Sequence, residues 1–290
     1  MRHLFISLRP EQWIKNLFVL APLVFGGKLL SCPENLRAVA ACVLFSLVSS
    51  TVYLINDILD YDQDKAHPVK RLRPIPAGKI TRKQAAFLAL LIGPVSVILS
   101  FVLNVQFGCV ILVYFLFNFL YSKILKKIVL IDLFCIAVFF LLRIVAGTVV
   151  AEVVFSYWMI LTVFLLAIFL GANKRRQDLV LLKDKAGESR SVLNEYNAYL
   201  IDQIISVVTS SIVVVYMLYT VDNRTVSIFG TSHLLYSIPF VYYGIFRYLY
   251  LVHKVHKYGD PTHILLSDKM LQFNIAGWIL TCVAVIYFHI

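Results

Sequence analysis

The chain has 290 residues, of which 60% are hydrophobic and only 15% are charged, and its formal net charge is +11. Soluble globular domains are about 45–50% apolar and about 25% charged, so this composition excludes an ordinary soluble protein and indicates an integral membrane protein. The positive charge alone would suit a nucleic-acid partner, but its placement along the chain argues against one.

Nine apolar runs predict nine transmembrane helices and therefore an all-α fold. They lie near residues 17–31, 37–56, 84–103, 107–122, 128–150, 155–172, 203–221, 233–252 and 271–289. Each is close to the roughly 20 residues that a helix needs to cross the hydrocarbon core. The first is the weakest, because it is short and contains Pro22, Gly26, Gly27 and Lys28. No separate soluble segment is visible, so we expect one domain over residues 1–290.

The lysines and arginines predict the orientation of these helices. The N-terminus and the loops at 57–83, 123–127, 173–202 and 253–270 hold 22 of the 27. The positive-inside rule makes that side cytoplasmic and places the C-terminus outside. Arg143 is an exception within the fifth run, where a charge is expensive and usually functional. We interpret it as a structural residue, with a position facing a lipid tunnel as the alternative.

The stretch "YLINDILDYDQDKAHPVKRLRPIPAGK" places four charged or amide side chains, Asn56, Asp57, Asp60 and Asp64, at the cytoplasmic end of the second run. Offsets of three and seven bring Asp57, Asp60 and Asp64 to nearly the same face of a helix. Like charges on one face repel unless a cation lies among them, and Mg²⁺ favours such oxygen ligands. The spacing therefore predicts a catalytic Mg²⁺ site supported by Asn56. A solvated acidic helix end is the alternative, although acids there oppose the helix dipole.

Basic residues follow this acidic motif directly. Lys70, Arg71 and Arg73 are candidates for binding the phosphate oxygens of a substrate, because cations beside a bound metal can hold the oxygens that the metal leaves free. The alternative is ordinary positive charge on a cytoplasmic loop.

The pattern N-D-x-x-D-x-x-x-D at this position resembles the signature of the UbiA-type intramembrane prenyltransferase superfamily. The "RP" at Arg73–Pro74 and "YSKILKK" at residues 121–127 strengthen the resemblance. It implies nine transmembrane helices around a central cavity that opens to the cytoplasm and laterally to lipid. It also implies a multi-pass protein of the bacterial inner membrane in which Mg²⁺ bridges the Asp residues to a diphosphate. Tyr121 and Lys126 would close the cavity floor, with an interfacial aromatic as the alternative role for Tyr121.

The end of the sixth run, "GANKRRQDLVLLKD", departs from the common family pattern of a second acidic motif. Asp178 stands where one acid is expected, but Leu182 follows four residues later, and Lys174, Arg175 and Arg176 precede it. Two phosphorylated substrates repel each other and need fixed cations as well as metal. This replacement of acidic by basic residues resembles the decaprenyl-phosphate phosphoribosyltransferase branch. Two further stretches resemble the same branch: "RPEQWIKNLFVLAPLVF" at residues 9–25 and "GDPTHILLSDKMLQ" at residues 259–272.

That branch implies transfer of a phosphoribosyl group from 5-phosphoribosyl 1-diphosphate to a polyprenyl monophosphate, yielding a precursor of lipid-linked arabinose for the cell wall. Lys15 and Asn16 would hold the lipid phosphate, and Lys174, Arg175 and Asp178 would face the acidic motif. The main alternative is an aromatic prenyltransferase that moves a polyprenyl chain to a quinone or haem precursor. A transporter would not explain the acidic motif. The sequence leaves open whether the protein forms a homo-oligomer.

Overall fold

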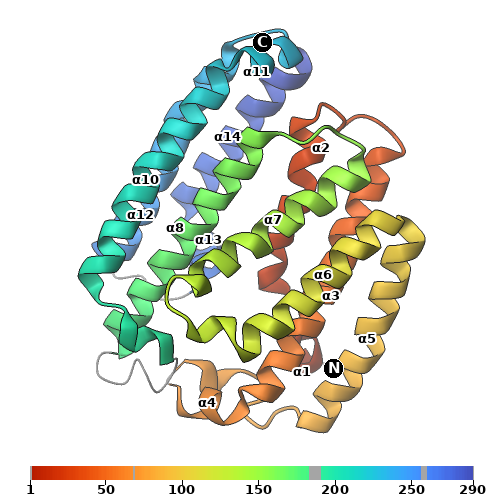
Figure 1. The fold of residues 1–290 in the computed structure, drawn as a ribbon, viewed down its shortest axis with the longest axis vertical. Coiled ribbons are helices and arrows are strands. Elements are labelled where there is room, and N and C mark those ends of the chain that lie inside the picture. The colour runs from red at the N-terminus through yellow and green to blue at the C-terminus, as the bar shows by residue number, and fades with distance from the viewer. Residues whose placement is uncertain (1, 68, 183–190, 256–259, 290) are drawn as a thin grey trace. The chain divides into compact units, whose positions relative to one another are not determined.

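The computed structural model describes residues 2–67, 69–182, 191–255 and 260–289, and every regular element in these ranges is a helix (Figure 1). Within these described ranges, seven helices are long and apolar enough to cross a membrane. They are α3 (Glu34–Leu59), α5 (Arg82–Leu103), α6 (Val105–Lys123), α7 (Ile131–Ala151), α8 (Tyr157–Leu182), α10 (Ala198–Val221) and α14 (Lys269–Phe288). The prediction of an all-α membrane protein is confirmed for this part of the chain.

The other two predicted spans are built differently. The first apolar run is split between η1 (Pro10–Leu20), a 3-10 helix, and α2 (Ala21–Phe25), and the eighth is split between η6 (His233–Ser237) and α12 (Ile238–His253). In both cases a proline stands at the start of the α-helix, where its missing N–H costs nothing and a new helix can begin. The prediction of nine membrane-spanning helices stays a prediction.

Short helices occupy the connections. They are α1 (Arg2–Ser7), α4 (Tyr61–Ala66), η2 (Lys70–Leu72), η3 (Leu125–Lys127), η5 (Ser191–Glu195), α11 (Asn223–Phe229) and α13 (Pro261–Ser267).

The chain divides into two compact units, one of residues 1–135, 142–154 and 184–195 and the other of 136–141, 155–183 and 196–290. The prediction of a single domain stays a prediction.

In the first unit, α5 packs closely along α3. A Cβ at Gly93 would lie 2.9 Å from the Cγ2 of Thr51, so a residue with no side chain is needed where the two helices approach. Near the end of α3, a buried cluster joins the helix to the loop that follows it; its members are Leu54, Ile75, Ile80, Ala85 and Ala89. This cluster fixes the loop of residues 70–80 against the acidic end of α3.

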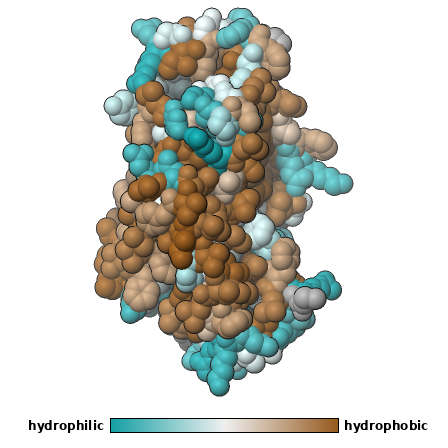
Figure 2. Space-filling view, turned by 90° about the vertical axis from the view of Figure 1, so that its right-hand side faces the viewer, coloured by the Kyte–Doolittle hydropathy of each residue, from teal (hydrophilic) through white to brown (hydrophobic). Residues whose placement is uncertain are grey.

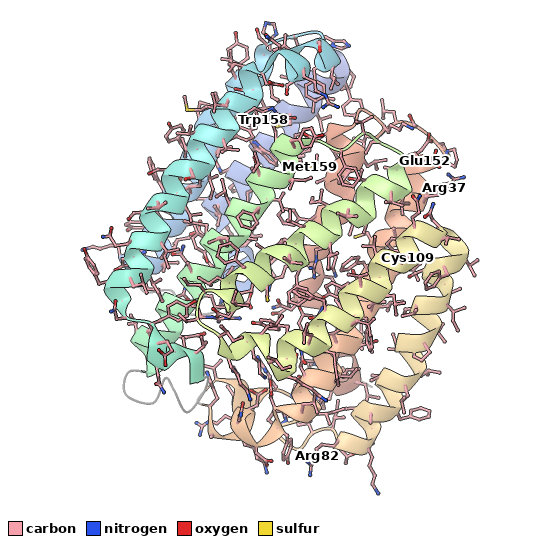
Figure 3. All side chains as sticks on the ribbon, in the orientation of Figure 1. Arg37, Arg82, Cys109, Glu152, Trp158 and Met159 are labelled. Atoms are coloured by element: carbon pink, nitrogen blue, oxygen red, sulfur yellow. The ribbon has the colours of Figure 1, made fainter. Side chains whose placement is uncertain are left out.

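One face of the structure has the apolar surface of a membrane protein. Figure 2 shows a face on which hydrophobic side chains dominate the middle, with hydrophilic side chains gathered toward the two ends. Arg37 Nη1 lies 2.9 Å from Glu152 Oε1, and Figure 3 shows this pair at the end of the unit opposite Arg82. Arg37 and Arg82 therefore lie at opposite ends of this unit.

The second unit is held together by α8 against α10 and by α12 against α14. A buried hydrogen-bonded chain supports it: the Tyr216 hydroxyl lies 2.6 Å from Ser237 Oγ and accepts from Trp278 Nε1 at 2.9 Å. Buried polar groups are stable only when they are paired. These hydrogen bonds therefore fix how α10, η6 and α14 pack against one another.

Candidate active site at the end of α3

The three aspartates of the acidic motif lie where α3 passes into α4. Asp57 is in the last turn of α3, Asp60 stands at the junction, and Asp64 is in α4. The Asp60 N–H donates to Asn56 O and the Asp64 N–H donates to Asp60 O, each at 2.8 Å, so the backbone keeps a helical path through the junction. Asp57 and Asp64 are each 2% exposed, whereas the Asp60 side chain is 34% exposed.

Arg73 joins Asp57 and Asp64. Its Nη1 lies 3.2 Å from Asp57 Oδ1 and 2.6 Å from Asp64 Oδ2. Lys70 adds a second cation, with Nζ 3.7 Å from Asp64 Oδ1. The structure therefore brings together two of the three predicted metal ligands and two of the predicted phosphate-binding cations. Charge-assisted bonds to a guanidinium are among the stronger hydrogen bonds in proteins, so these contacts fix both carboxylates.

Arg9 is a site residue that the sequence analysis missed. Its Nη2 donates to Asp57 Oδ1, and its guanidinium carbon lies 4.9 Å from the centre of the Tyr53 ring. Burial, followed by the nearby charge of Arg73, lowers the pKa of the Arg9 guanidinium, although an arginine stays protonated near pH 7. Arg9 opens the motif "RPEQWIKN", which was the available signal.

The backbone of Arg9 is also unusual. Its φ of 53° and ψ of 58° are left-handed, a conformation that few residues other than glycine adopt and that is often found at functional sites. The conformation turns the chain from α1 into η1 and directs the arginine side chain toward α3.

Asp60 faces a different partner. Lys126 Nζ lies 3.0 Å from Asp60 Oδ1 and 3.2 Å from Oδ2. Beside it, Ser122 Oγ donates to Asn56 Oδ1 at 2.8 Å. The three carboxylates predicted to share one helix face are therefore not equivalent: Asp57 and Asp64 form a buried pair, and Asp60 is more exposed. Lys126 of "YSKILKK" supplies the cation that pairs with Asp60.

The remaining predicted residues of this unit are placed less centrally. Arg71 is exposed and Tyr121 is half-buried. Lys15 Nζ donates to Gln12 Oε1 at 2.6 Å. Asn16 is fully buried, and its side-chain nitrogen donates to Ser46 Oγ at 3.0 Å and Ser49 Oγ at 3.1 Å.

The donor set at this site fits Mg²⁺. Asp57, Asp60 and Asp64 offer only carboxylate oxygens, and Asp57 and Asp64 are close enough to share one guanidinium nitrogen. Among the described residues no group of three His, Cys, Asp or Glu side chains converges on one point. Mg²⁺ is usually held by one or two carboxylates together with substrate phosphates, so the pair meets the requirement.

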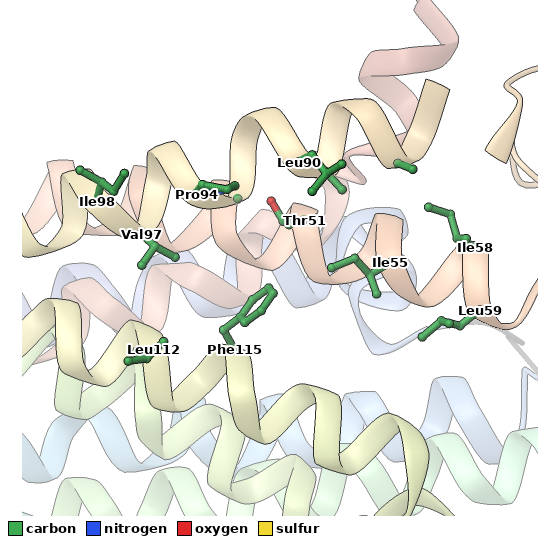
Figure 4. A pocket seen from close by; sticks show the side chains of 13 residues that line it. Thr51, Ile55, Ile58, Leu59, Leu90, Pro94, Val97, Ile98, Leu112 and Phe115 are labelled. Atoms are coloured by element: carbon green, nitrogen blue, oxygen red, sulfur yellow. The ribbon is translucent and has the colours of Figure 1, made fainter. Parts of the chain in front are cut away.

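An apolar groove between α3, α5 and α6 is separate from this site. It has a volume of about 500 Å³ and is lined by side chains that include Ile55, Ile58, Leu90 and Phe115 (Figure 4). At 3.6 residues per turn, Ile55 and Asp57 point about 200° apart on α3. The groove therefore opens on the opposite face of the helix from the acidic residues.

The predicted residues of the second unit have partners within that unit. Lys174 Nζ lies 2.8 Å from Asp260 Oδ2, and Arg175, 2% exposed, has its Nη1 3.5 Å from Asp178 Oδ2. Asp260 also caps α13, since its Oδ1 accepts from the Thr262 N–H at 3.1 Å. Asp260 was not predicted as a site residue, although it stands in "GDPTHILLSDKMLQ", whose Gly259 lies outside the described residues.

Comparisons with known proteins agree with the fold and with the family resemblance of the sequence. A family model described as the UbiA prenyltransferase family matches residues 18–264. Decaprenyl-phosphate phosphoribosyltransferase of Mycolicibacterium smegmatis is 32% identical, covering 97% of this chain and 92% of its own length. The protein of the same name from Corynebacterium glutamicum is 31% identical over 97% of this chain and 86% of its own.

The fold has solved counterparts. The structure of a UbiA homologue from Archaeoglobus fulgidus, bound to GPP and Mg²⁺, superposes with a TM-score of 0.71 at 20% identity, covering 96% of this chain and 97% of that one. The fold and the sequence thus define an intramembrane prenyltransferase-type protein. The chain belongs to the UbiA prenyltransferase family, and the family resemblance predicted from its sequence is confirmed.

Proposed function

We propose that the protein transfers the 5-phosphoribosyl group of 5-phosphoribosyl 1-diphosphate to a membrane polyprenyl monophosphate and releases diphosphate. The observation that carries the proposal is the 32% identity, along 97% of the chain, to a decaprenyl-phosphate phosphoribosyltransferase. The end of α3 supports it, because carboxylates suited to a metal lie beside arginines suited to phosphate oxygens.

The proposed reaction is a single displacement. An oxygen of the acceptor phosphate forms a bond to ribose C1, while the bond from C1 to the diphosphate oxygen breaks and its electron pair leaves with the diphosphate. The acceptor phosphate is already anionic near pH 7, so no side chain has to remove a proton. The protein has to position the two substrates and neutralise their charges.

The acidic motif is proposed to bind the leaving group. Asp57, Asp60 and Asp64 would hold Mg²⁺, with Asn56 supporting them, and the bound metal would neutralise charge on the departing diphosphate. In the described structure, cations contact each of the three carboxylates. A metal would compete with Arg9, Arg73 and Lys126 for these carboxylate oxygens, and a displaced cation would be available for phosphate oxygens.

Other cations are proposed to bind the remaining phosphates. Lys70, Arg71 and Arg73 would hold the diphosphate or the ribose 5-phosphate, with Tyr121 and Lys126 closing the site. Lys174 and Arg175, with Asp178, would bind a substrate phosphate from the second unit, and Lys15 would hold the lipid phosphate. The Asn16 amide is already committed to Ser46 and Ser49, so its contribution to the lipid phosphate would be to fix the segment that carries Lys15.

The finer topology is part of the same proposal. Nine transmembrane helices would surround a cavity that opens to the cytoplasm and to lipid, with a cytoplasmic N-terminus and a location in the bacterial inner membrane. The support is the distribution of charge, because 22 of the 27 Lys and Arg stand in the N-terminus and the loops assigned to the cytoplasm.

One experiment separates this function from the alternative, an aromatic polyprenyl transfer within the same family. Purified protein in detergent or vesicles is incubated with Mg²⁺, polyprenyl monophosphate and labelled 5-phosphoribosyl 1-diphosphate, and in parallel with labelled polyprenyl diphosphate and 4-hydroxybenzoate. Mass spectrometry of the extracted lipid should show a polyprenyl-phosphoryl 5-phosphoribose in the first reaction. Prenylated 4-hydroxybenzoate with no phosphoribosyl lipid would establish the alternative.

A further inference from the structure

The segment Arg9–Leu20, here called the N-terminal strap, lies along one polar face of α3. Trp13 Nε1 donates to Ser50 Oγ at 2.9 Å, and Ser50 Oγ is 2.8 Å from the Leu8 carbonyl oxygen. One turn away, Asn16 Nδ2 donates to Ser46 Oγ at 3.0 Å. In the other direction, the same face of α3 continues to Tyr53 and Asp57, which contact Arg9 at the start of the strap. These contacts, made at several points along the strap, fix which residue of the strap faces which residue of α3.

Arg143 of α7 holds the buried end of this strap. It is 4% exposed, and its Nε donates to Asn16 Oδ1 at 2.9 Å. Its guanidinium carbon lies 4.9 Å from the centre of the Phe45 ring and 5.2 Å from that of Tyr114. A charge within a membrane-spanning helix is expensive and is usually retained for a function. Here the charge is directed at the side chain that fixes the strap to α3.

The backbones of α7 and the strap also meet directly. A Cβ at Gly147 would lie 2.0 Å from the Val19 carbonyl oxygen, so no larger residue fits unless the strap moves. Gly147 follows Arg143 by one helical turn and lies on the same face of α7. The two residues form one surface of α7 that contacts the strap.

We propose that Arg143 is a positioning residue for Arg9. Through Asn16 it fixes the register of the strap, and the strap in turn delivers the Arg9 guanidinium to Asp57. The inference rests on the proposed function only in taking Asp57 as a metal ligand. Without substrate, Arg9 then competes with a divalent cation for Asp57; with substrate, it contributes a positive charge beside the diphosphate.

The test measures divalent metal binding and not turnover. Mn²⁺ affinity of the purified protein, without substrates, is measured by the electron paramagnetic resonance signal of free Mn²⁺ for the wild type, Arg9→Ala, Arg143→Met and the double variant. Removing a cation from Asp57 favours the metal, so Arg9→Ala should tighten Mn²⁺ binding at least about fivefold. Arg143→Met should do the same, and the double variant should show no further gain, because both changes act through one contact.

Matched variants separate positioning from general stability. Arg247→Met removes an arginine of the apolar helix α12, one paired with Asp268 at 2.9 Å, and should leave Mn²⁺ affinity unchanged. Gly147→Ala displaces the strap without altering any charge and should reproduce Arg143→Met. Arg143→Lys keeps a donor for Asn16 and should restore affinity toward the wild-type value. The inference would be overturned if Arg143→Met lowered the melting temperature but kept the wild-type Mn²⁺ affinity. It would also be overturned if the effects of Arg9→Ala and Arg143→Met on Mn²⁺ affinity were additive in the double variant.

A second measurement does not depend on metal. Ser7 is 1% exposed and precedes Arg9, so a cysteine introduced there, in a background without Cys32 and Cys109, should react slowly with a water-soluble maleimide. Arg143→Met should accelerate labelling and Arg247→Met should not. If the wild type binds no Mn²⁺, the proposed metal role of Asp57 fails, and the labelling rates alone decide whether Arg143 fixes the strap. If Arg143→Met does not fold, Gly147→Ala and Arg143→Lys supply the same comparison.

Discussion

The side chains of Lys126 and Asp60 form an ion pair, with Nζ 3.0 Å from Oδ1, across a separation of 66 residues in the sequence. Asp57 and Asp64 have a different cation in common, Arg73. The negative charge of the acidic motif is already balanced by protein cations. Under the proposed function, a divalent metal would take the carboxylates while the displaced cations turn to the phosphates of the substrate.

The first prediction concerns the carboxylates. Asp57→Asn and Asp60→Asn should each lower turnover at least about 100-fold, because a lost metal ligand removes several kcal/mol of charge stabilisation. Phosphoribosyl transfer is measured against Mg²⁺ concentration, with folding checked by thermal melting. Asp62→Asn, an exposed acid of the same segment, is the matched control and should behave as the wild type. Near-normal turnover of Asp60→Asn, or full wild-type turnover in excess chelator, would refute the metal role.

The second prediction concerns the fork of Arg73. Arg73→Lys keeps the positive charge but loses the planar guanidinium, whose two parallel N–H donors suit the oxygens of a phosphate better than a single ammonium does. We expect KM for the phosphoribosyl donor to rise about tenfold, the effect of losing one charged hydrogen bond. Arg82→Lys, an exposed arginine stacked 4.7 Å from the Tyr61 ring, is the control. Equal KM values for the two variants would remove Arg73 from the substrate-binding set.

The sequence predicted the helices best where apolar length alone decides the structure. Seven uninterrupted runs became helices long enough to span a membrane. In the two runs that gave no single long helix, a proline stands in the first turn of a new α-helix, Pro22 in α2 and Pro239 in α12, whereas Pro94 lies inside α5 without ending it. Hydropathy reports burial in lipid, whereas the backbone geometry of these residues decides where a helix begins and ends.

The sequence predicted only those parts of the candidate site that depend on the spacing of residues close together in the chain. Seven residues on a helical path bring Asp57 and Asp64 together, and this could be calculated in advance. The contact of Arg9 with Asp57 spans 48 residues and depends on how the strap packs on α3. Nothing in the local sequence fixes such a contact. The same limit applies to Asp260 and Lys174, which are 86 residues apart.

The third prediction concerns the donor. Leu182 stands where the wider family is expected to place a second acid, so the protein should not hold a polyprenyl diphosphate through two metal sites. We expect transfer from 5-phosphoribosyl 1-diphosphate and no transfer of geranylgeranyl or longer chains to 4-hydroxybenzoate. The measurement is product formation with each donor at equal concentration. Robust prenylation of 4-hydroxybenzoate would overturn the assignment to a phosphoribosyl-transferring branch.

The fourth prediction separates Lys174 from Arg175 at the end of α8. The Lys174 side chain is 38% exposed and that of Arg175 is 2% exposed. If each binds a substrate phosphate, its replacement by alanine leaves a phosphate poorly paired and should cost a few kcal/mol, on the order of 100-fold in kcat/KM. Because Arg175 is also part of the buried interior, Arg175→Ala should lower the melting temperature as well, whereas Lys174→Ala should not.

The adjacent Arg176 provides the control for this comparison. Its Nε lies 2.5 Å from Asp202 Oδ1, within the same unit, and it was not assigned to a substrate. Arg176→Ala removes the same charge from the same helix end, so any general effect of cytoplasmic charge on lipid or substrate attraction appears in all three variants. A phosphate-binding role requires Lys174→Ala and Arg175→Ala to exceed Arg176→Ala in kcat/KM. Changes below about threefold in both would show that these residues are ordinary positive charges of a cytoplasmic surface, which contribute little individually.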